Sequence, residues 1–224
     1  MKIKVGMGAE DFNNTLPISA QVNIVSLSVF KALMDSFQLP NKTQRFIMKI
    51  ESVKLFKDHI EIFFNHGSKV KAFFNGQYQK YDVNGNLRST GGIGTTRGVH
   101  KGRVKLKIEG IEMYLERLIL IGCDIANGEV AISYKGWEAN VMDGSGNRET
   151  AEKLGIKQNY SPENLEWCLK HDNAVHGNMI KKLSKITGKV YRFSANDRNL
   201  TALYQSKQNR KLCQYCSTYL KRIK

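Results

Sequence analysis

The residues best suited to chemistry lie between Trp137 and Ile180. Asn140 belongs to a predicted strand that runs into an Asp-Gly turn at 143–144, since Asp-Gly has the backbone freedom that a tight reversal needs. Asn173 and His176 follow on a predicted helix, where a spacing of three places them on one face. Side-chain amide oxygens are ligands for hard cations such as Mg²⁺. The pattern predicts a strand, a loop, a short second strand or loop, and a helix that carry these groups.

Three segments, in the same order along the chain, resemble the core of homing-type HNH endonucleases, which hold one divalent metal ion against a DNA phosphate. They are Asn140-Val141-Met142-Asp143-Gly144, then Glu163-Asn164-Leu165-Glu166-Trp167-Cys168, then Asp172-Asn173 with His176. The resemblance implies a ββα-metal core, Mg²⁺ as the cofactor and DNA as the partner. It implies that Asn140 and Asn173 hold the metal, and that His176 contacts phosphate or braces the fold. We expect Asn164 and Trp167 to be scaffold and Asp143 to turn the chain.

Two histidines of that family are absent. The general base of the resembled enzymes stands at the position of Val141, and an earlier family histidine stands where this chain has Glu116. Valine cannot accept a proton, and general acid–base catalysis contributes on the order of 10²–10⁴-fold. The catalytic base is therefore unassigned, and the chain has either lost cleavage or moved its base. Glu116 replaces the base only if the fold brings it beside 140 and 141; His171 and His176 are the histidines nearest the core.

Upstream segments extend the resemblance and set the expected domains. Gly76–Ser89 resembles a small module that precedes HNH cores, a strand, an Asn-Gly turn and a second strand that presents Arg88. Residues 102–119 resemble a further strand, turn and apolar segment. We expect an α+β fold with three parts: an N-terminal helix plus β-meander over 1–75, the upstream module and HNH-like core over 76–180, and a basic helical tail over 181–224.

The chain is strongly basic, with 35 Lys and Arg against 20 Asp and Glu, a net charge of +15 and a pI near 9.7. This balance is typical of chains that neutralise phosphates. Residues 177–224 hold eight Lys and four Arg against one acid, and a glycine-rich basic loop over 89–107 is expected to contact the DNA backbone or to be a solvated hairpin. The expected nucleic-acid contacts are Arg88, Arg97, Lys101, Arg103, Lys105, Lys107, His176, Lys181, Lys182 and Lys185. DNA is the expected partner, with RNA or a nucleic-acid enzyme as the alternatives.

Membrane insertion and a disulfide framework are not expected. No apolar run approaches the ~20 residues that cross a bilayer, and acidic residues interrupt the first residues where a signal peptide is apolar. We expect an intracellular, cytoplasmic protein. Cys213 and Cys216 have the spacing of half a zinc site, which Cys168 with His171 would complete, but reduced thiols are the expectation for four cysteines in a chain of this size.

The first third of the chain has its own pattern. An apolar stripe over 26–39 predicts a helix that ends before Pro40, either packed on a sheet or free to bind a partner. From Arg45 the period changes, and 46–56, 59–64 and 70–74 predict an antiparallel meander. His59 and His66 are expected in solvent. In the tail, Thr187-Gly188 should end the core helix, and further helices are expected near 196–206 and 209–222. The aromatic residues from Tyr191 and Phe193 onward either stack on bases or face inward.

Overall fold

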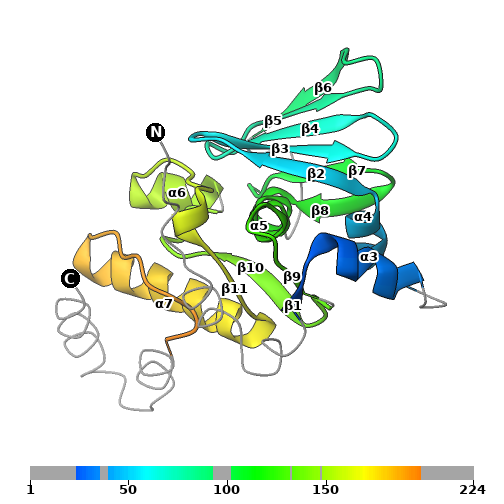
Figure 1. Ribbon diagram of the computed structural model, residues 1–224. Coiled ribbons are helices and arrows are strands. Elements are labelled where there is room, and N and C mark those ends of the chain that lie inside the picture. Colours follow the sequence, from blue (N-terminus) through cyan, green and yellow to red (C-terminus); the bar gives the residue numbers. More distant parts are fainter. Residues whose placement is uncertain (1–23, 36–39, 93–101, 132, 147, 198–224) are drawn as a thin grey trace.

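The computed structural model describes residues 24–35, 40–92, 102–131, 133–146 and 148–197, which form a mixed α+β fold (Figure 1). A five-stranded antiparallel sheet lies on one side of helix α5 (Leu115–Ala126). A separate antiparallel strand pair lies on the other side of α5, followed by helix α7 (Lys170–Thr187). The predicted α+β class is confirmed. Within the described residues, no helix has both the length and the apolar character that crossing a membrane requires.

The N-terminal helices pack against the core. Helix α3 (Leu27–Asp35) buries Phe30 and Met34, which supports the packing role expected for this helix. Helix α4 (Lys42–Met48) follows, and here the prediction of a strand from Arg45 was wrong. Asn41 begins a capping box, in which its side chain accepts from the Gln44 amide and the Gln44 side chain accepts from the Asn41 amide. This local cap satisfies the first helical amides, so the chain stays helical up to Met48.

The predicted meander is confirmed from residue 50 onward. The sheet contains, in sequential order, β2 (Ile50–Leu55), β3 (His59–Phe64), β4 (Lys69–Phe73), β5 (Tyr78–Tyr81) and β6 (Leu87–Gly91). Asp82 closes the β5–β6 turn, because its Oδ1 accepts from the amides of Asn84 and Asn86 while Gly85 takes a positive φ of 78°. The strand, turn and strand expected here are therefore present. The sheet runs across the boundary expected at 75/76, so its strands come from both sides of it.

The expectation that His59 lies in solvent was wrong. Its side chain is buried, with its ring stacked on Phe56 at a centroid distance of 4.4 Å and tilted against Phe73 at 5.4 Å. Asp58 Oδ1 lies 2.6 Å from Nδ1 of the ring. Two flanking aromatic rings, which the linear pattern does not reveal, exclude water from this imidazole. His66, in contrast, lies in the exposed β3–β4 turn as expected.

Helix α5 is the central element of the fold. The hairpin β7 (Lys105–Ile108) and β8 (Ile111–Tyr114) leads into it, and its apolar side packs on β2, β3 and β4. Gly122 allows close approach to the sheet, since a Cβ there would lie 2.5 Å from Cδ1 of Ile60. On the other side of α5, Arg117 donates to the Trp137 carbonyl at 2.8 Å. Helix α5 thereby connects the sheet to the strand pair.

The strand pair and helix expected over the core are present. Strand β10 (Trp137–Val141) pairs antiparallel with β11 (Leu165–Leu169), and β11 runs directly into α7. Between the strands lie helix α6 (Arg148–Leu154) and the 3-10 turn η2 (Pro162–Asn164). Gly188, at φ 65°, ends α7 as expected. Helix α7 continues through the boundary expected at 180/181, so the described start of the tail belongs to the core helix.

Scaffold residues of this part behave as expected. Trp167 is buried and donates from Nε1 to Oδ2 of Asp124 at 3.0 Å. Asn164 is buried and donates to the Asn159 carbonyl, and Asp143 turns the chain by accepting from the Ser145 amide at 2.8 Å. A short pair, β1 (Ile24–Val25) with β9 (Val130–Ala131), completes the described sheets. Arg97, Lys101, Cys213, Cys216, most of the tail and the first 23 residues lie outside the described residues.

Candidate functional site

The residues expected to bind metal line one pocket of about 160 Å³ between β10, α7 and the start of α5. Asn140 and Val141 come from β10, Asn173 from α7, Glu116 from the first turn of α5 and Arg103 from the segment before β7. The pocket unites side chains that are up to 78 positions apart in the chain, from Arg103 to Lys181. The fold thus places Glu116 at the pocket that contains Asn140 and Val141.

The amide of Asn140 is oriented by a buried carboxylate. Asn140 and Glu166 are register partners on β10 and β11, and Nδ2 of Asn140 donates to Oε1 of Glu166 at 2.7 Å. Glu166 also accepts from the Ser194 hydroxyl at 2.5 Å and the Ala195 amide at 2.6 Å. Burial raises the pKa of Glu166, while these hydrogen bonds act in the opposite direction. Because the hydrogen bond to Glu166 fixes the NH₂ group of Asn140, the amide atom left to act as an acceptor is Oδ1.

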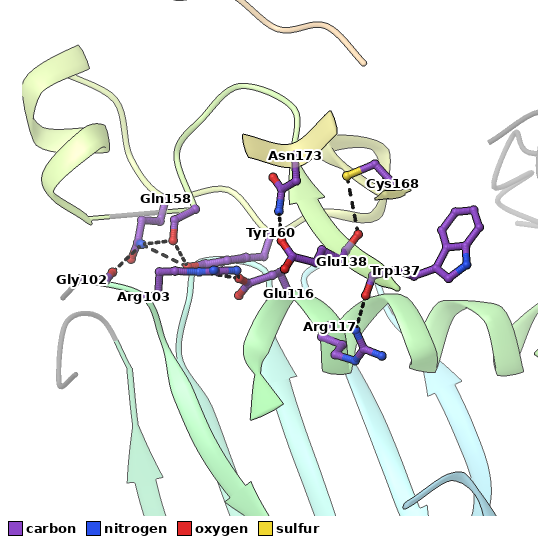
Figure 2. Close-up of polar contacts among 11 residues, drawn as sticks. Gly102, Arg103, Glu116, Arg117, Trp137, Glu138, Gln158, Tyr160, Cys168 and Asn173 are labelled. Atoms are coloured by element: carbon purple, nitrogen blue, oxygen red, sulfur yellow. Dashed lines mark hydrogen bonds and ion pairs between the residues drawn. The ribbon is translucent and has the colours of Figure 1, made fainter. Parts of the chain in front are cut away.

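Asn173 has the same arrangement on the opposite wall. Its Nδ2 donates to Oε2 of Glu138 at 2.7 Å, a contact between α7 and β10 (Figure 2). A carboxylate behind a ligand group both fixes its orientation and increases its basicity, which is the usual arrangement around metal ligands in proteins. The two amides therefore suit a hard divalent cation better than two unsupported asparagines would. The candidate metal ligands are thus two neutral amide groups, each hydrogen-bonded to a carboxylate.

The base of the pocket holds a buried ion pair. Oε1 of Glu116 accepts from Nε of Arg103 at 2.9 Å and also from its Nη2 (Figure 2). The Glu116 side chain is 1% exposed, and no described group hydrogen-bonds its Oε2. Burial raises the pKa of Glu116, opposed by the charge and hydrogen bonds of Arg103. The guanidinium also lies 3.9 Å from the ring centroid of Tyr114.

A network behind Arg103 supports its position. Nε2 of Gln158 donates to the Gly102 carbonyl at 3.4 Å and to the Tyr160 hydroxyl at 3.1 Å, and that hydroxyl donates to the Gly146 carbonyl at 3.0 Å (Figure 2). These contacts hold the residue before Arg103 against the β10–α6 loop. Arg103 was expected to contact nucleic acid. In this structure its guanidinium is instead engaged by a carboxylate inside the protein.

Val141 stands where a general base would lie in the resembled enzymes. Its side chain is buried, lines the pocket, and packs on Gly146, at which a Cβ would approach Cγ2 of Val141 to 2.5 Å. The position thus lines the same pocket as the two amides but carries no group that accepts a proton. The only carboxylate among the described residues that line this pocket is that of Glu116.

His176 lines the pocket and braces the fold. Its ring is 2% exposed, hydrogen-bonds through Nε2 to the Phe193 carbonyl at 2.9 Å, and packs edge-to-face on the Phe193 ring. Burial lowers the pKa of His176 to about 4, so the ring is neutral at pH 7. Of the two roles expected for His176, bracing is the one its contacts support. Phe193 is buried, so this tail aromatic faces inward.

The other expected nucleic-acid contacts fall into two groups. Lys181 is exposed and lines the pocket one turn beyond Gly177, with exposed Lys185 on the next turn and Lys182 half-buried between them. The remaining described cations lie away from the pocket on the hairpins. They are Arg88, which is exposed and paired with Asp82 at 2.8 Å, Lys105, which is paired with Glu112 at 2.6 Å, and exposed Lys107.

Two supporting carboxylates were not singled out from the sequence. Glu138 is two positions before Asn140, so strand alternation places both on one face of β10, and this signal was present in the sequence. The contact of Glu166 with Asn140 could not be predicted without the register of β10 and β11. Within the described ranges, no three His, Cys, Asp or Glu side chains are grouped as a metal site. Cys123 and Cys168 are buried free thiols whose pKa values burial raises.

Comparisons with known proteins gave no family for this chain. No family model matches the sequence, and neither a curated protein nor a solved structure matches it.

Proposed function

We propose that this protein binds DNA with its pocket over a backbone phosphate and cleaves one strand with the help of a single Mg²⁺. The observation that carries the proposal is the convergence of Asn140 and Asn173 on one pocket, each with its NH₂ group held by a carboxylate. The antiparallel pair β10–β11 followed by α7 supports it, because this is the element order expected of a ββα-metal core. The net charge of +15 supports a polyanionic partner.

Each pocket residue has a role in this proposal. The Oδ1 atoms of Asn140 and Asn173 would hold the ion, which when bound stabilises negative charge on the leaving oxygen. Lys181, exposed at the pocket, neutralises an adjacent phosphate. Glu116 takes the place of the absent imidazole and accepts the proton of the attacking water at Oε2. Burial raises the pKa of Glu116, which makes its carboxylate a stronger base, while the charge and hydrogen bonds of Arg103 favour the ionised form.

A second function, DNA binding without cleavage, is favoured by one specific observation. Val141 occupies the wall where the base is expected, and the Glu116 carboxylate is 1% exposed and closed off by Arg103. If water does not reach the buried Oε2 of Glu116, the pocket binds a phosphate and no proton is removed. The two functions share the binding surface and differ only in turnover.

Nicking of supercoiled plasmid in Mg²⁺ or Mn²⁺ distinguishes them. We expect nicking by the parent chain, loss of nicking in Asn173→Ala, and a decrease on the order of 10²–10⁴-fold in Glu116→Gln. Asn178→Ala is the matched control, since Asn178 is exposed on the same helix and does not line the pocket. An inert parent that gains nicking in Val141→His would establish the binding function. A parent that neither nicks plasmid nor retards duplex DNA at low salt would exclude both.

A further inference from the structure

The five-stranded sheet has a second face, opposite α5, whose side chains differ sharply from the core. Ile60, Ile62 and Val70 are buried on the α5 side, and a Cβ at Gly122 would contact the first two. Because side chains alternate along a strand, the residues between them project from the opposite face. Figure 1 shows α5 beneath one side of β2, β3 and β4. The side chains on the other side are mainly lysines and aromatic rings.

Strand register arranges these side chains in rows across the sheet. Phe63, Lys69 and Tyr81 are successive partners on β3, β4 and β5. The next row, two residues along, contains Lys54, Glu61, Lys71 and Gln79, and the third contains His59 and Phe73. Neighbouring strands are about 4.8 Å apart and successive rows about 7 Å. A row rich in lysine thus separates two rows of aromatic rings.

The lysines and rings already contact one another. Lys69 Nζ lies 5.5 Å from the ring centroid of Phe63 and 4.9 Å from that of Tyr81. Lys71 Nζ lies 5.0 Å from the Phe73 centroid, and Lys54 Nζ lies 5.1 Å from that of Phe63. The three rings are half-buried, so each retains exposed surface. The long lysine stems can turn the ammonium groups from the rings to phosphates without movement of the backbone.

We propose that this sheet face binds single-stranded nucleic acid. Bases stack on aromatic side chains regardless of sequence, while cations between the rings follow the backbone. In a duplex the base faces are already stacked inside the helix, so the rings would have no partner. Among the described residues in the three rows, this face carries three lysines and one carboxylate, that of Glu61, which pairs with Lys69 at 3.3 Å, and the remaining positive charge favours a polyanion over a neutral peptide. The inference does not rest on the pocket, which lies on the other side of α5.

The test is the affinity of the full chain for fluorescein-labelled oligonucleotides, measured by anisotropy. The probes are oligo(dT) and oligo(rU) of about twelve nucleotides, a length within the range that small stacking surfaces cover, and a duplex of equal length. Phe63→Leu with Tyr81→Leu should weaken single-strand binding at least about tenfold, because leucine keeps the apolar contacts but removes the stacking surface. Duplex affinity should not change. Preference for one oligonucleotide would identify DNA or RNA as the ligand, and binding of either supports the proposal.

The lysines provide an independent measurement. Lys69→Gln with Lys71→Gln should reduce the slope of log affinity against log salt by about 1.4, since a single strand contributes about 0.7 per neutralised phosphate. The matched control, Lys135→Gln with Lys153→Gln, changes two exposed lysines outside this face and should leave the slope unchanged. If the leucine variant does not melt cooperatively, the lysine variant alone decides. Single-strand affinity equal to the parent in the leucine variant, an equal loss for single strand and duplex, or an unchanged slope in the lysine variant would overturn the proposal.

Discussion

Glu116 and Arg103 form a buried ion pair at the base of the pocket, with two guanidinium nitrogens donating to one carboxylate oxygen. The second oxygen of Glu116 has no described hydrogen-bond partner. The pair joins the first turn of α5 to the segment before β7, and Gln158 and Tyr160 support it from behind. Its energetic role follows from burial, because a charge that loses its partner inside a protein is costly.

Removal of Arg103 should therefore destabilise the fold. Arg103→Ala leaves the Glu116 charge buried and unpaired, and we expect a loss of about 3–5 kcal/mol in the free energy of unfolding at pH 8. Urea denaturation measures this value. The loss should become smaller as the pH falls, since burial raises the pKa of Glu116 and the unpaired carboxylate can then take up a proton. Lys105→Ala is the control, because the Lys105–Glu112 pair is exposed and should contribute little. Equal effects of the two variants would contradict the assigned role of the buried pair.

Asp124 should make the protein less stable as pH rises. It is fully buried, accepts from the Tyr134 hydroxyl at 2.7 Å and the Trp167 indole at 3.0 Å, and burial raises its pKa from 3.8 to about 8. A raised pKa in the folded state means that the stabilising contribution is complete below about pH 4 and is lost as pH rises through about 8.

Asp124→Asn removes this titration. Between pH 4 and pH 9, the parent should lose free energy of unfolding relative to the variant by an amount on the order of 5 kcal/mol. Urea curves at several pH values measure the difference. Parallel pH profiles for parent and variant would show that Asp124 does not titrate in this range.

His176 should make the protein less stable as the pH falls. Burial lowers its pKa from 6.5 to about 4, so the stability it contributes is complete above about pH 6.5 and is lost as pH falls through about 4. His176→Gln cannot gain a charge, and the parent should lose about 3 kcal/mol relative to this variant between pH 7 and pH 3.5. Chemical shifts of the His176 ring protons provide a direct check, and a midpoint near 6.5 would contradict burial as the cause.

Two helical glycines should respond to alanine in opposite directions. At Gly177 on α7 an added Cβ meets nothing within 4 Å, so Gly177→Ala should stabilise the protein by about 1 kcal/mol through helix propensity. At Gly122 on α5 the Cβ would lie 2.5 Å from Ile60, and Gly122→Ala should cost about 1–3 kcal/mol through overpacking. Thermal melting of both variants tests the pair, and a lower melting temperature for Gly177→Ala would be inconsistent with the open helix face.

Local chemistry explains what could be predicted from the sequence. The Asp-Gly turn after β10, the glycine that ends α7, and the alternating apolar residues of β3 and β4 are short-range signals, and each element formed where it was expected. The net positive charge of the protein and the residue composition of α7 can also be determined from the sequence alone. Helix α4 was missed because apolar spacing over Phe46–Met48 suits a strand as well as a helix, and only the Asn41 cap decides between them.

Tertiary structure determined which groups the candidate site residues contact. Periodicity places Asn140 and Asn173 on particular faces of β10 and α7, but only the packing of α7 on β10 and of β10 on α5 brings them to one pocket with Glu116. Phe56 and Phe73 bury His59, contact with Phe193 buries His176, and Arg103 pairs with a carboxylate rather than with solvent. These outcomes depend on contacts between residues far apart in the chain, for which a single sequence contains no local signal.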